Sequence, residues 1–179
     1  MESRLGNIII GAAGGTAGAG SKTYKLSLPS SWMNELGISD DDRQVKLSFD
    51  GQKIVLSRRC SMDEFKERAL AESHLLYSIK YYDGEKLCSL LYADFTDREL
   101  QVENYTDALI KTAFGRNEAP VWSDFMEFLE DRCVPRQRAG LNEYLDALGL
   151  DEYDPFEIVK RTSGRMAEDS QWIKVEELK

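Results

Sequence analysis

The chain has 179 residues, of which 42% are hydrophobic and 31% charged, and this balance excludes a disordered chain. No apolar run approaches the roughly 18 residues that a membrane span needs, so we expect a cytoplasmic protein that has no membrane partner. The net charge of −9 excludes general nucleic-acid binding by the whole chain. Residues 1–60 nevertheless hold eight basic and six acidic residues, which leaves −11 for residues 61–179. This split predicts two functional regions.

Glycines dominate residues 11–20, directly after a short apolar stretch at residues 6–10 that predicts a strand. A Walker-type phosphate loop requires lysine directly after its last glycine, but Ser21 separates Gly20 from Lys22. The dinucleotide fingerprint is also out of register, and the residues that follow alternate like a strand where both motifs need a helix. We therefore expect a flexible connector or a wide hairpin loop, and an enzyme that uses this loop is the weakest functional hypothesis.

Three strands and one short helix are expected between residues 22 and 60. Apolar and polar residues alternate in these strands, as they do in half-buried strands. The strands are expected at residues 22–28, 45–49 and 54–56. A one-turn helix over residues 32–36 ends at Gly37, and Asp50-Gly51 predicts a hairpin turn between the last two strands.

An ordered series of short motifs runs through these elements. It consists of Lys25-Leu-Ser-Leu-Pro-Ser-Ser-Trp32, Glu35-Leu-Gly-Ile-Ser39, Arg43-Gln-Val-Lys-Leu-Ser-Phe-Asp-Gly51 and Lys53-Ile-Val-Leu56. The series covers about a third of the chain and resembles the AbrB/MazE/SpoVT family of swapped-hairpin DNA-binding domains. In that family, apolar strand faces of one copy interleave with a second copy, and basic side chains of the pair contact DNA. The resemblance therefore implies a homodimer that binds double-stranded DNA.

Six basic side chains are the DNA-contact candidates that this resemblance implies. They are Lys22, Lys25, Arg43, Lys46, Arg58 and Arg59. Each lies on or beside a strand with alternating apolar residues, so we expect its charge to point outward, and ordinary solubilising charges are the alternative interpretation. Ser30 and Ser31 stand where family members often carry Lys or Arg, and their hydroxyl groups offer only weaker phosphate contacts.

The acidic remainder predicts a charged linker helix at residues 61–74 and a small α+β domain at residues 75–179. Its strands and helices follow one another along the chain, with a turn at Asp83-Gly84. An antiparallel meander is expected at residues 75–82, 87–95 and 100–105, helices at 107–114, 123–134, 141–148 and 154–164, and an edge strand at 171–175. The predicted fold class is therefore α+β, in which an N-terminal strand and glycine-rich loop (1–21) and an AbrB-like β domain (22–60) precede an antiparallel meander with three or four helices.

Cysteine and histidine are too few and too scattered for a metal centre or a disulfide framework. Cys60, Cys88 and Cys133 are odd in number, far apart and free of any CxxC spacing, so three reduced, partly buried thiols are expected. His74 is the only histidine, and one histidine cannot build a two-histidine metal site. The sequence therefore predicts no metal, no cofactor and no catalytic residue, because the many carboxylates lack a nucleophile–base pair beside them.

A basic cluster stands out within the acidic region. Its members are the candidate partner-binding residues Arg132, Arg136, Arg138, Arg161 and Arg165. These side chains either pair internally or grip a phosphate group or an acidic partner.

Two functions of different classes follow. The leading hypothesis is a transcriptional regulator or antitoxin-like protein that dimerises through its first region and holds a protein partner, such as a toxin, with its acidic region. The alternative is an inhibitor of the anti-CRISPR type, encoded on a mobile element, that binds an effector nuclease and blocks its nucleic-acid binding or cleavage. The acidic region resembles modules of bacterial mobile elements in its general composition, and this resemblance implies no residue roles.

Overall fold

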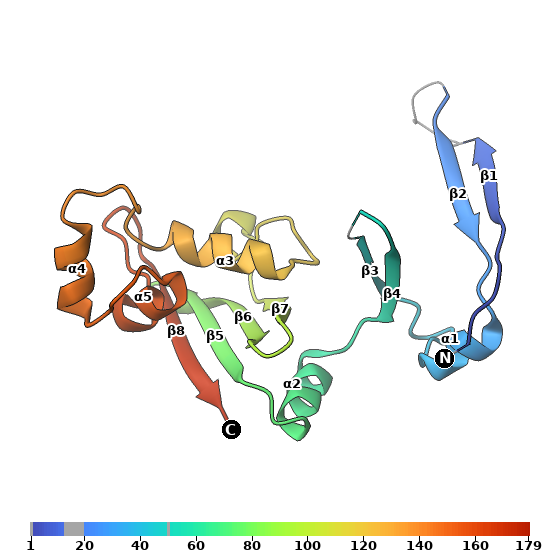
Figure 1. The fold of residues 1–179 in the computed structure, drawn as a ribbon, viewed down its shortest axis with the longest axis horizontal. Helices are drawn as coiled ribbons and strands as arrows, with labels where there is room; N and C mark the ends of the chain where they lie inside the picture. The colour runs from blue at the N-terminus through green and yellow to red at the C-terminus, as the bar shows by residue number, and fades with distance from the viewer. Residues whose placement is uncertain (1, 13–19, 50) are drawn as a thin grey trace. The chain divides into compact units, whose positions relative to one another are not determined.

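The computed structural model describes residues 2–12, 20–49 and 51–179. The chain divides into two compact units, unit 1 with residues 1–59 and unit 2 with residues 60–179 (Figure 1). Helices and antiparallel strands occur together, so the predicted α+β class is confirmed. Among the described residues, no helix combines the length and the apolar character that crossing a membrane requires.

Unit 1 consists of two β-hairpins and a short helix. Strand β1 (Ile8–Ala12) pairs antiparallel with β2 (Lys22–Leu26), and β3 (Val45–Phe49) pairs in the same way with β4 (Ile54–Arg58). Each pair forms a separate two-stranded sheet. The glycine-rich residues 13–19 and Asp50 of the predicted turn lie outside the described residues.

The short helix α1 (Ser30–Glu35) follows Pro29 directly, two residues before the predicted start. Pro29 is the N-cap residue, and it cannot supply the side-chain hydrogen bond that a serine cap would give. At the other end, Gly37 has a φ of 71° and its N–H donates to the carbonyl of Asn34, as expected for a glycine that ends a helix.

No described residue of unit 1 is buried. Its large apolar side chains are exposed instead. Those with more than half of their surface exposed are Leu5, Ile8, Ile9, Ile10, Tyr24, Leu26, Leu47, Phe49 and Ile54. The expectation of half-buried strands is therefore wrong for a single chain, because a two-stranded hairpin buries neither face unless another layer packs on it.

A four-stranded antiparallel sheet forms the centre of unit 2, in the order β7-β6-β5-β8. The strands are β5 (Leu76–Asp83), β6 (Lys86–Asp94), β7 (Glu99–Asn104) and β8 (Gln171–Leu178). The first three form the predicted meander, and Gly84 adopts a φ of 58° in the turn between β5 and β6. The predicted edge strand is confirmed, because β8 pairs only with β5.

Helices cover both faces of this sheet. On one face, α2 (Met62–Ala71) buries Phe65 and Ala69 against Leu76 of β5. A capping box starts α2, since Ser61 accepts the N–H of Glu64. The helix expected as a linker thus packs within unit 2.

The opposite face of the sheet carries the main core. Tyr77, Ile79 and Tyr81 of β5 alternate toward α3 (Trp122–Asp131) and α5 (Pro155–Thr162), and α4 (Leu141–Leu148) adds Leu145. Aromatic rings meet edge to face there, with the Tyr77 and Phe156 centroids 4.8 Å apart. Such packing gives unit 2 the core that unit 1 lacks.

Two helix predictions need correction. Residues 107–114 contain only a 3-10 turn (Leu109–Lys111). The chain is extended at Thr112, whose buried hydroxyl donates to the carbonyl of Leu109, and Ala113 and Phe114 reach the core outside a helix. Helix α3 begins one residue early, at Trp122, where the Asp124 carboxylate accepts the N–H of Val121. It also ends at Asp131, four residues before Pro135.

Candidate nucleic-acid interface

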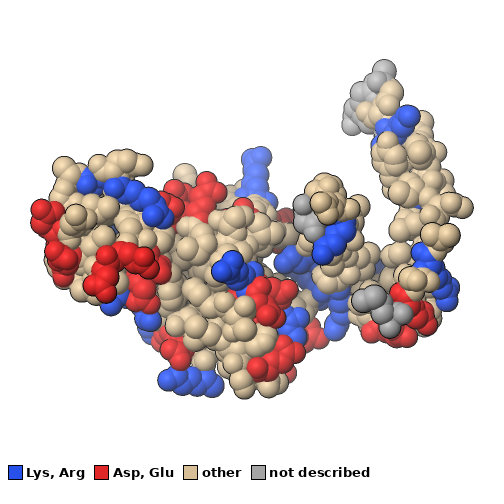
Figure 2. Space-filling model, viewed as in Figure 1, with Lys and Arg blue, Asp and Glu red and all other residues tan. Residues whose placement is uncertain are grey.

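The β1–β2 hairpin of unit 1 has one apolar face. Ile8 lies opposite Leu26 and Ile10 opposite Tyr24, and residues directly opposite one another share a face. The hairpin surface is mostly uncharged in Figure 2. Lys25 lies opposite Ile9, on the other face of the hairpin.

The β3–β4 hairpin has the same design. Leu47 lies opposite Leu56 and Phe49 opposite Ile54, which together form an apolar face. Lys46 pairs with Ser57 on the opposite face, next to the Ser48–Val55 pair. Each hairpin thus carries one basic strand residue, Lys25 or Lys46, on the side away from its main apolar face.

The remaining strand candidates lie on the apolar faces. Lys22 is opposite Ala12, and Arg58 is opposite Val45, in each case at the end of the strand pair. Because side chains alternate along a strand, Lys22 and Lys25 point to different faces, as do Lys46 and Arg58. The six predicted side chains are all exposed or half-exposed, but each hairpin divides its strand residues between two faces.

The local partners of these basic side chains differ. Arg58 Nε lies 3.0 Å from Asp42 Oδ2, and Arg59 donates to Gln44 Oε1 at 2.8 Å, so both arginines hold β4 to the segment before β3. The other four candidates are Lys22, Lys25, Arg43 and Lys46. They form no ion pair with the described residues (2–12, 20–49 and 51–179), so their charges are available to phosphate.

Arg4 is a further basic residue of unit 1, outside the six predicted candidates. Its guanidinium lies 5.8 Å from the ring centroid of Trp32, and the Trp32 indole N–H donates to Glu2. These interactions attach the segment before β1 to α1. In the sequence, only Trp32, directly after Ser30 and Ser31, indicates that α1 has such contacts.

The basic cluster of unit 2 requires one correction. Arg132 is one of the five candidate partner-binding residues, and of the two alternatives it takes internal pairing: its side chain is only 9% exposed and donates to both carboxylate oxygens of Asp169, at 2.6 and 3.0 Å. It also donates to the carbonyls of Gly164 and Gln171, each at 2.9 Å. The hydrogen bonds from Arg132 hold the pKa of Asp169 below its ordinary value. Arg132 therefore connects α3 to the segment before β8 and is not available to a partner.

The other four arginines of the cluster are more accessible. Arg136 pairs with Glu130 and Arg161 with Glu157, in exposed ion pairs. Arg138 and Arg165 form no ion pair within the described chain; they lie over the rings of Tyr144 and Trp172. Both line a pocket of about 400 Å³ beside Glu168.

Comparisons with protein-family models, with curated proteins and with solved structures found no match to this chain. Fold and site define an α+β protein with two amphipathic hairpins in unit 1 and a packed, acidic unit 2.

Proposed function

We propose that the protein is a DNA-binding regulator or antitoxin-like protein that dimerises through unit 1. The observation that carries this proposal is the pair of hairpins whose apolar faces are exposed in the single chain. Leu47, Phe49 and Ile54 expose 64%, 70% and 72% of their surface. Exposed apolar faces of this kind are favoured sites for association, because burying them against a second copy removes apolar area from water.

The positions of the lysines support DNA as the ligand of such a dimer. If the apolar faces of two copies cover one another, Lys25 and Lys46 stay in water, because they lie on the opposite faces of their hairpins. Two copies then present each lysine twice, with two-fold symmetry that suits a palindromic duplex. Each phosphate that a lysine neutralises releases counterions, so binding weakens as salt rises.

Unit 2 supplies the second part of the proposal, a surface for a protein partner such as a toxin. Residues 61–179 carry −11, and Figure 2 shows acidic side chains gathered around α4 and α5. A partner with a basic surface complements this charge. Arg138 and Arg165, which line one pocket without an ion pair, are the basic side chains of unit 2 best placed for an acidic group of that partner.

Dimerisation is tested by the mass in solution of two variants that place a charge on the same strand. Phe49→Glu puts a carboxylate on the apolar face of β3, whereas Ser48→Glu puts it on the opposite face. We expect a dimer for the wild type and for Ser48→Glu, and a monomer for Phe49→Glu. A wild-type monomer contradicts the proposal.

DNA binding is tested by titrating palindromic duplexes at several salt concentrations. Replacing Lys25 and Lys46 with alanine should weaken binding and make it less salt-dependent, by roughly one unit of log–log slope for each phosphate that is no longer neutralised. Lys86→Ala with Arg116→Ala, exposed cations of unit 2, is the control with the same charge change.

A nuclease inhibitor of the anti-CRISPR type is the second candidate, and the charge of unit 2 favours it. An acidic surface competes with DNA or RNA for a basic channel. The test is whether the protein binds a DNA duplex at low salt. If it binds none, but binds an effector nuclease and blocks cleavage by that nuclease, the inhibitor hypothesis replaces the regulator hypothesis.

A further inference from the structure

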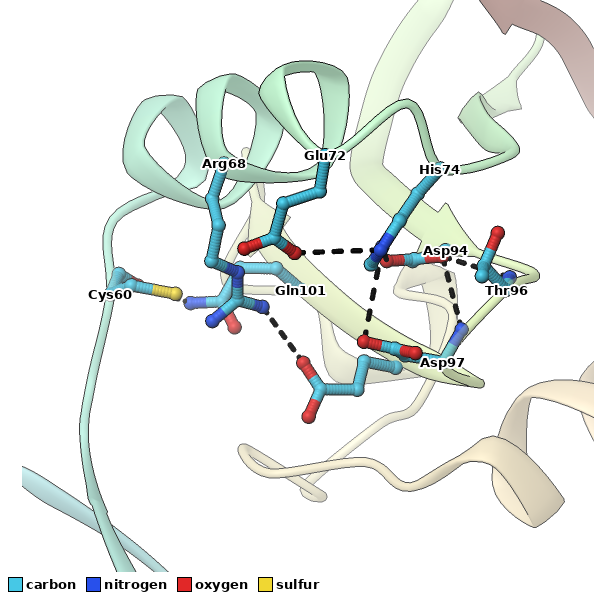
Figure 3. Close-up of polar contacts among 9 residues, drawn as sticks. Cys60, Arg68, Glu72, His74, Asp94, Thr96, Asp97 and Gln101 are labelled. Atoms are coloured by element: carbon cyan, nitrogen blue, oxygen red, sulfur yellow. Dashed lines mark hydrogen bonds and ion pairs between the residues drawn. The ribbon is translucent and has the colours of Figure 1, made fainter.

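One histidine in unit 2 is held by a buried carboxylate. His74 lies in the connection between α2 and β5, and its Nδ1 is 2.7 Å from Oδ2 of Asp94 (Figure 3). The Asp94 side chain is 1% exposed, and its other oxygen accepts the N–H groups of Thr96 and Asp97, at 2.9 and 3.3 Å. Asp94 is therefore fixed in place, and it fixes the orientation of the imidazole.

Two exposed carboxylates approach the same imidazole. Glu72 Oε2 lies 3.4 Å from His74 Nε2, and Asp97 Oδ2 lies 3.8 Å from Nδ1 (Figure 3). Glu72, His74 and Asp97 each offer one ligand atom, and these atoms all lie within 4.8 Å of one another. The two carboxylates are 54% and 58% exposed, so they can adjust their position without disturbing the core.

We propose that Glu72, His74 and Asp97 form a binding site for a divalent cation of the Zn²⁺ type. The hydrogen bond to Asp94 places the proton on Nδ1 of His74 and leaves the Nε2 lone pair for the metal. A carboxylate that orients a metal-binding histidine in this way is the usual support of such ligands.

The ligand set and its spacing fit zinc better than magnesium. Zinc binds imidazole nitrogen and carboxylate oxygen at roughly 2.0–2.2 Å, which puts tetrahedral ligand atoms roughly 3.3 Å apart. The observed separation of Glu72 Oε2 and His74 Nε2 is 3.4 Å. Asp97 Oδ2 lies nearest to Nδ1, at 3.8 Å, so the exposed carboxylate of Asp97 has to turn toward Nε2 when the metal binds. Magnesium prefers six oxygen ligands and keeps several waters, and it gains little from a nitrogen donor. Three protein ligands leave a fourth position of zinc open to water.

The backbone beside the proposed ligands adopts the left-handed conformation at two residues. Ser73, between Glu72 and His74, has a φ of 59°, and Arg98, next to Asp97, has a φ of 56°. Within the described chain, only one other residue that is not glycine has a positive φ. At Ser73 the positive φ ends α2 in the usual way, since the N–H groups of Ser73 and His74 donate to the carbonyls of Leu70 and Ala69. The end of α2 thus sets the position of His74 relative to Glu72.

Neighbouring hydrogen bonds hold both loops in these conformations. The N–H of His74 donates to the carbonyl of Ala69, and the N–H of Leu75 donates to Thr96 Oγ1. The second bond connects the loop that carries Glu72 and His74 to the loop that carries Asp97. The site is therefore built from two segments that are far apart in sequence, and it is independent of the DNA-binding surface proposed in unit 1.

The first test is a calorimetric titration of the full chain with Zn²⁺, and with Mg²⁺ for comparison. We expect one equivalent of Zn²⁺ to bind and Mg²⁺ to bind much more weakly. Glu72→Gln combined with Asp97→Asn should lower the Zn²⁺ affinity by at least about tenfold, the smallest effect usual for losing even a supporting residue. Both side chains are exposed, so the hydrogen bonds of Asp94 and the fold should be retained.

The control makes the same change of charge elsewhere in unit 2. Asp151→Asn with Glu152→Gln replaces two exposed carboxylates of the α4–α5 connection, and it should leave the Zn²⁺ affinity at the wild-type value. An equal loss of Zn²⁺ affinity in both double variants would show that Zn²⁺ binding depends only on net charge, and the proposal would be wrong. The absence of saturable Zn²⁺ binding to the wild type would also overturn it.

Nitrogen NMR of the imidazole gives a second readout, which needs no variant. His74 is the only histidine of the chain, so its two ring nitrogens are identified without ambiguity. On addition of one equivalent of Zn²⁺, the Nε2 resonance should shift to a metal-bound position while Nδ1 keeps its proton. Ring nitrogens that do not change while Zn²⁺ binds would show that the metal binds elsewhere, and the proposal would be wrong.

Discussion

Replacing Arg132 by methionine should destabilise unit 2 severely. The guanidinium makes two hydrogen bonds to Asp169 and one each to the carbonyls of Gly164 and Gln171. Arg132→Met keeps most of the aliphatic volume but removes these four hydrogen bonds, and Asp169 keeps only the backbone N–H of Gln171 as a donor to Oδ1.

The expected loss is about 3 kcal/mol in the free energy of unfolding. Removing one partner of a fully buried ion pair costs roughly 3–5 kcal/mol, because the other charge stays buried without compensation. The lower end applies here, since Asp169 is 33% exposed and water can replace part of the missing hydrogen bonding. For a domain of this size, such a loss lowers the melting temperature by about 10 °C.

Urea and thermal unfolding at pH 7, followed by circular dichroism, measure this loss. Arg161→Met is the matched control, because its ion pair with Glu157 is one helical turn apart and about one-third exposed. This control should cost about 0.5 kcal/mol. A loss below about 1 kcal/mol for Arg132→Met, or an equal loss for both variants, would refute the structural role assigned to Arg132.

Three further measurements test other parts of unit 2. The folded-state pKa of Asp169 lies below its ordinary value because Arg132 donates to its carboxylate. The stability from this pair is therefore complete when the pH is above the ordinary pKa, and it is lost as the pH falls through the folded-state pKa. The difference in unfolding free energy between wild type and Arg132→Met should accordingly be smaller at pH 3 than at pH 7. Burial raises the pKa of the Cys133 thiol to about 12, so peptide mapping after alkylation at pH 8 should find half-buried Cys60 modified and Cys133 modified only after unfolding. Gly164→Ala should cost about 2 kcal/mol in urea unfolding, because φ is 55° there and a Cβ would lie 3.1 Å from that of Arg132; an unchanged midpoint would contradict this geometry.

Local signals in the sequence located most elements of unit 2. The predicted helix over residues 141–148 matches α4, which ends at Gly149 in the left-handed conformation. The start of α5 follows from Asp154 and Pro155, since the Asp154 carboxylate accepts two backbone N–H groups of the first turn. These signals depend only on neighbouring residues, so a single sequence contains them.

Interactions between distant residues could not be predicted in this way. Arg132 and Asp169 are 37 residues apart, and His74 and Asp94 are 20 apart. An arginine in a charged helix and a lone histidine in a loop look like surface residues until the fold brings their partners beside them. Because one histidine cannot build a two-histidine site, the sequence predicts no metal centre, and Glu72, two residues before His74, gives no signal of the site proposed above.

The alternation of residues in unit 1 predicts the strands and also which residues of one strand share a face. Lys22 lies two and four residues before Tyr24 and Leu26 and therefore shares their apolar face, whereas Lys25 lies on the other face, and the pairing of β2 with β1 agrees. The sequence does not predict which residues of β1 lie opposite them, because register depends on the partner strand.

The pairing of β5 with β8 has a consequence for how the chain folds during synthesis. Leu76 lies opposite Leu178 and Asp83 opposite Gln171, so the ribosome makes β5 long before the strand that completes the sheet. Until β8 is made, β5 presents an open edge, and open edges attract other nascent chains. Lys80 lies in the middle of this edge, where it later pairs with Glu176. While β8 is still missing, the charge of Lys80 disfavours pairing of a second chain with this edge. The same side chain therefore protects the incomplete sheet from aggregation and stabilises the complete sheet.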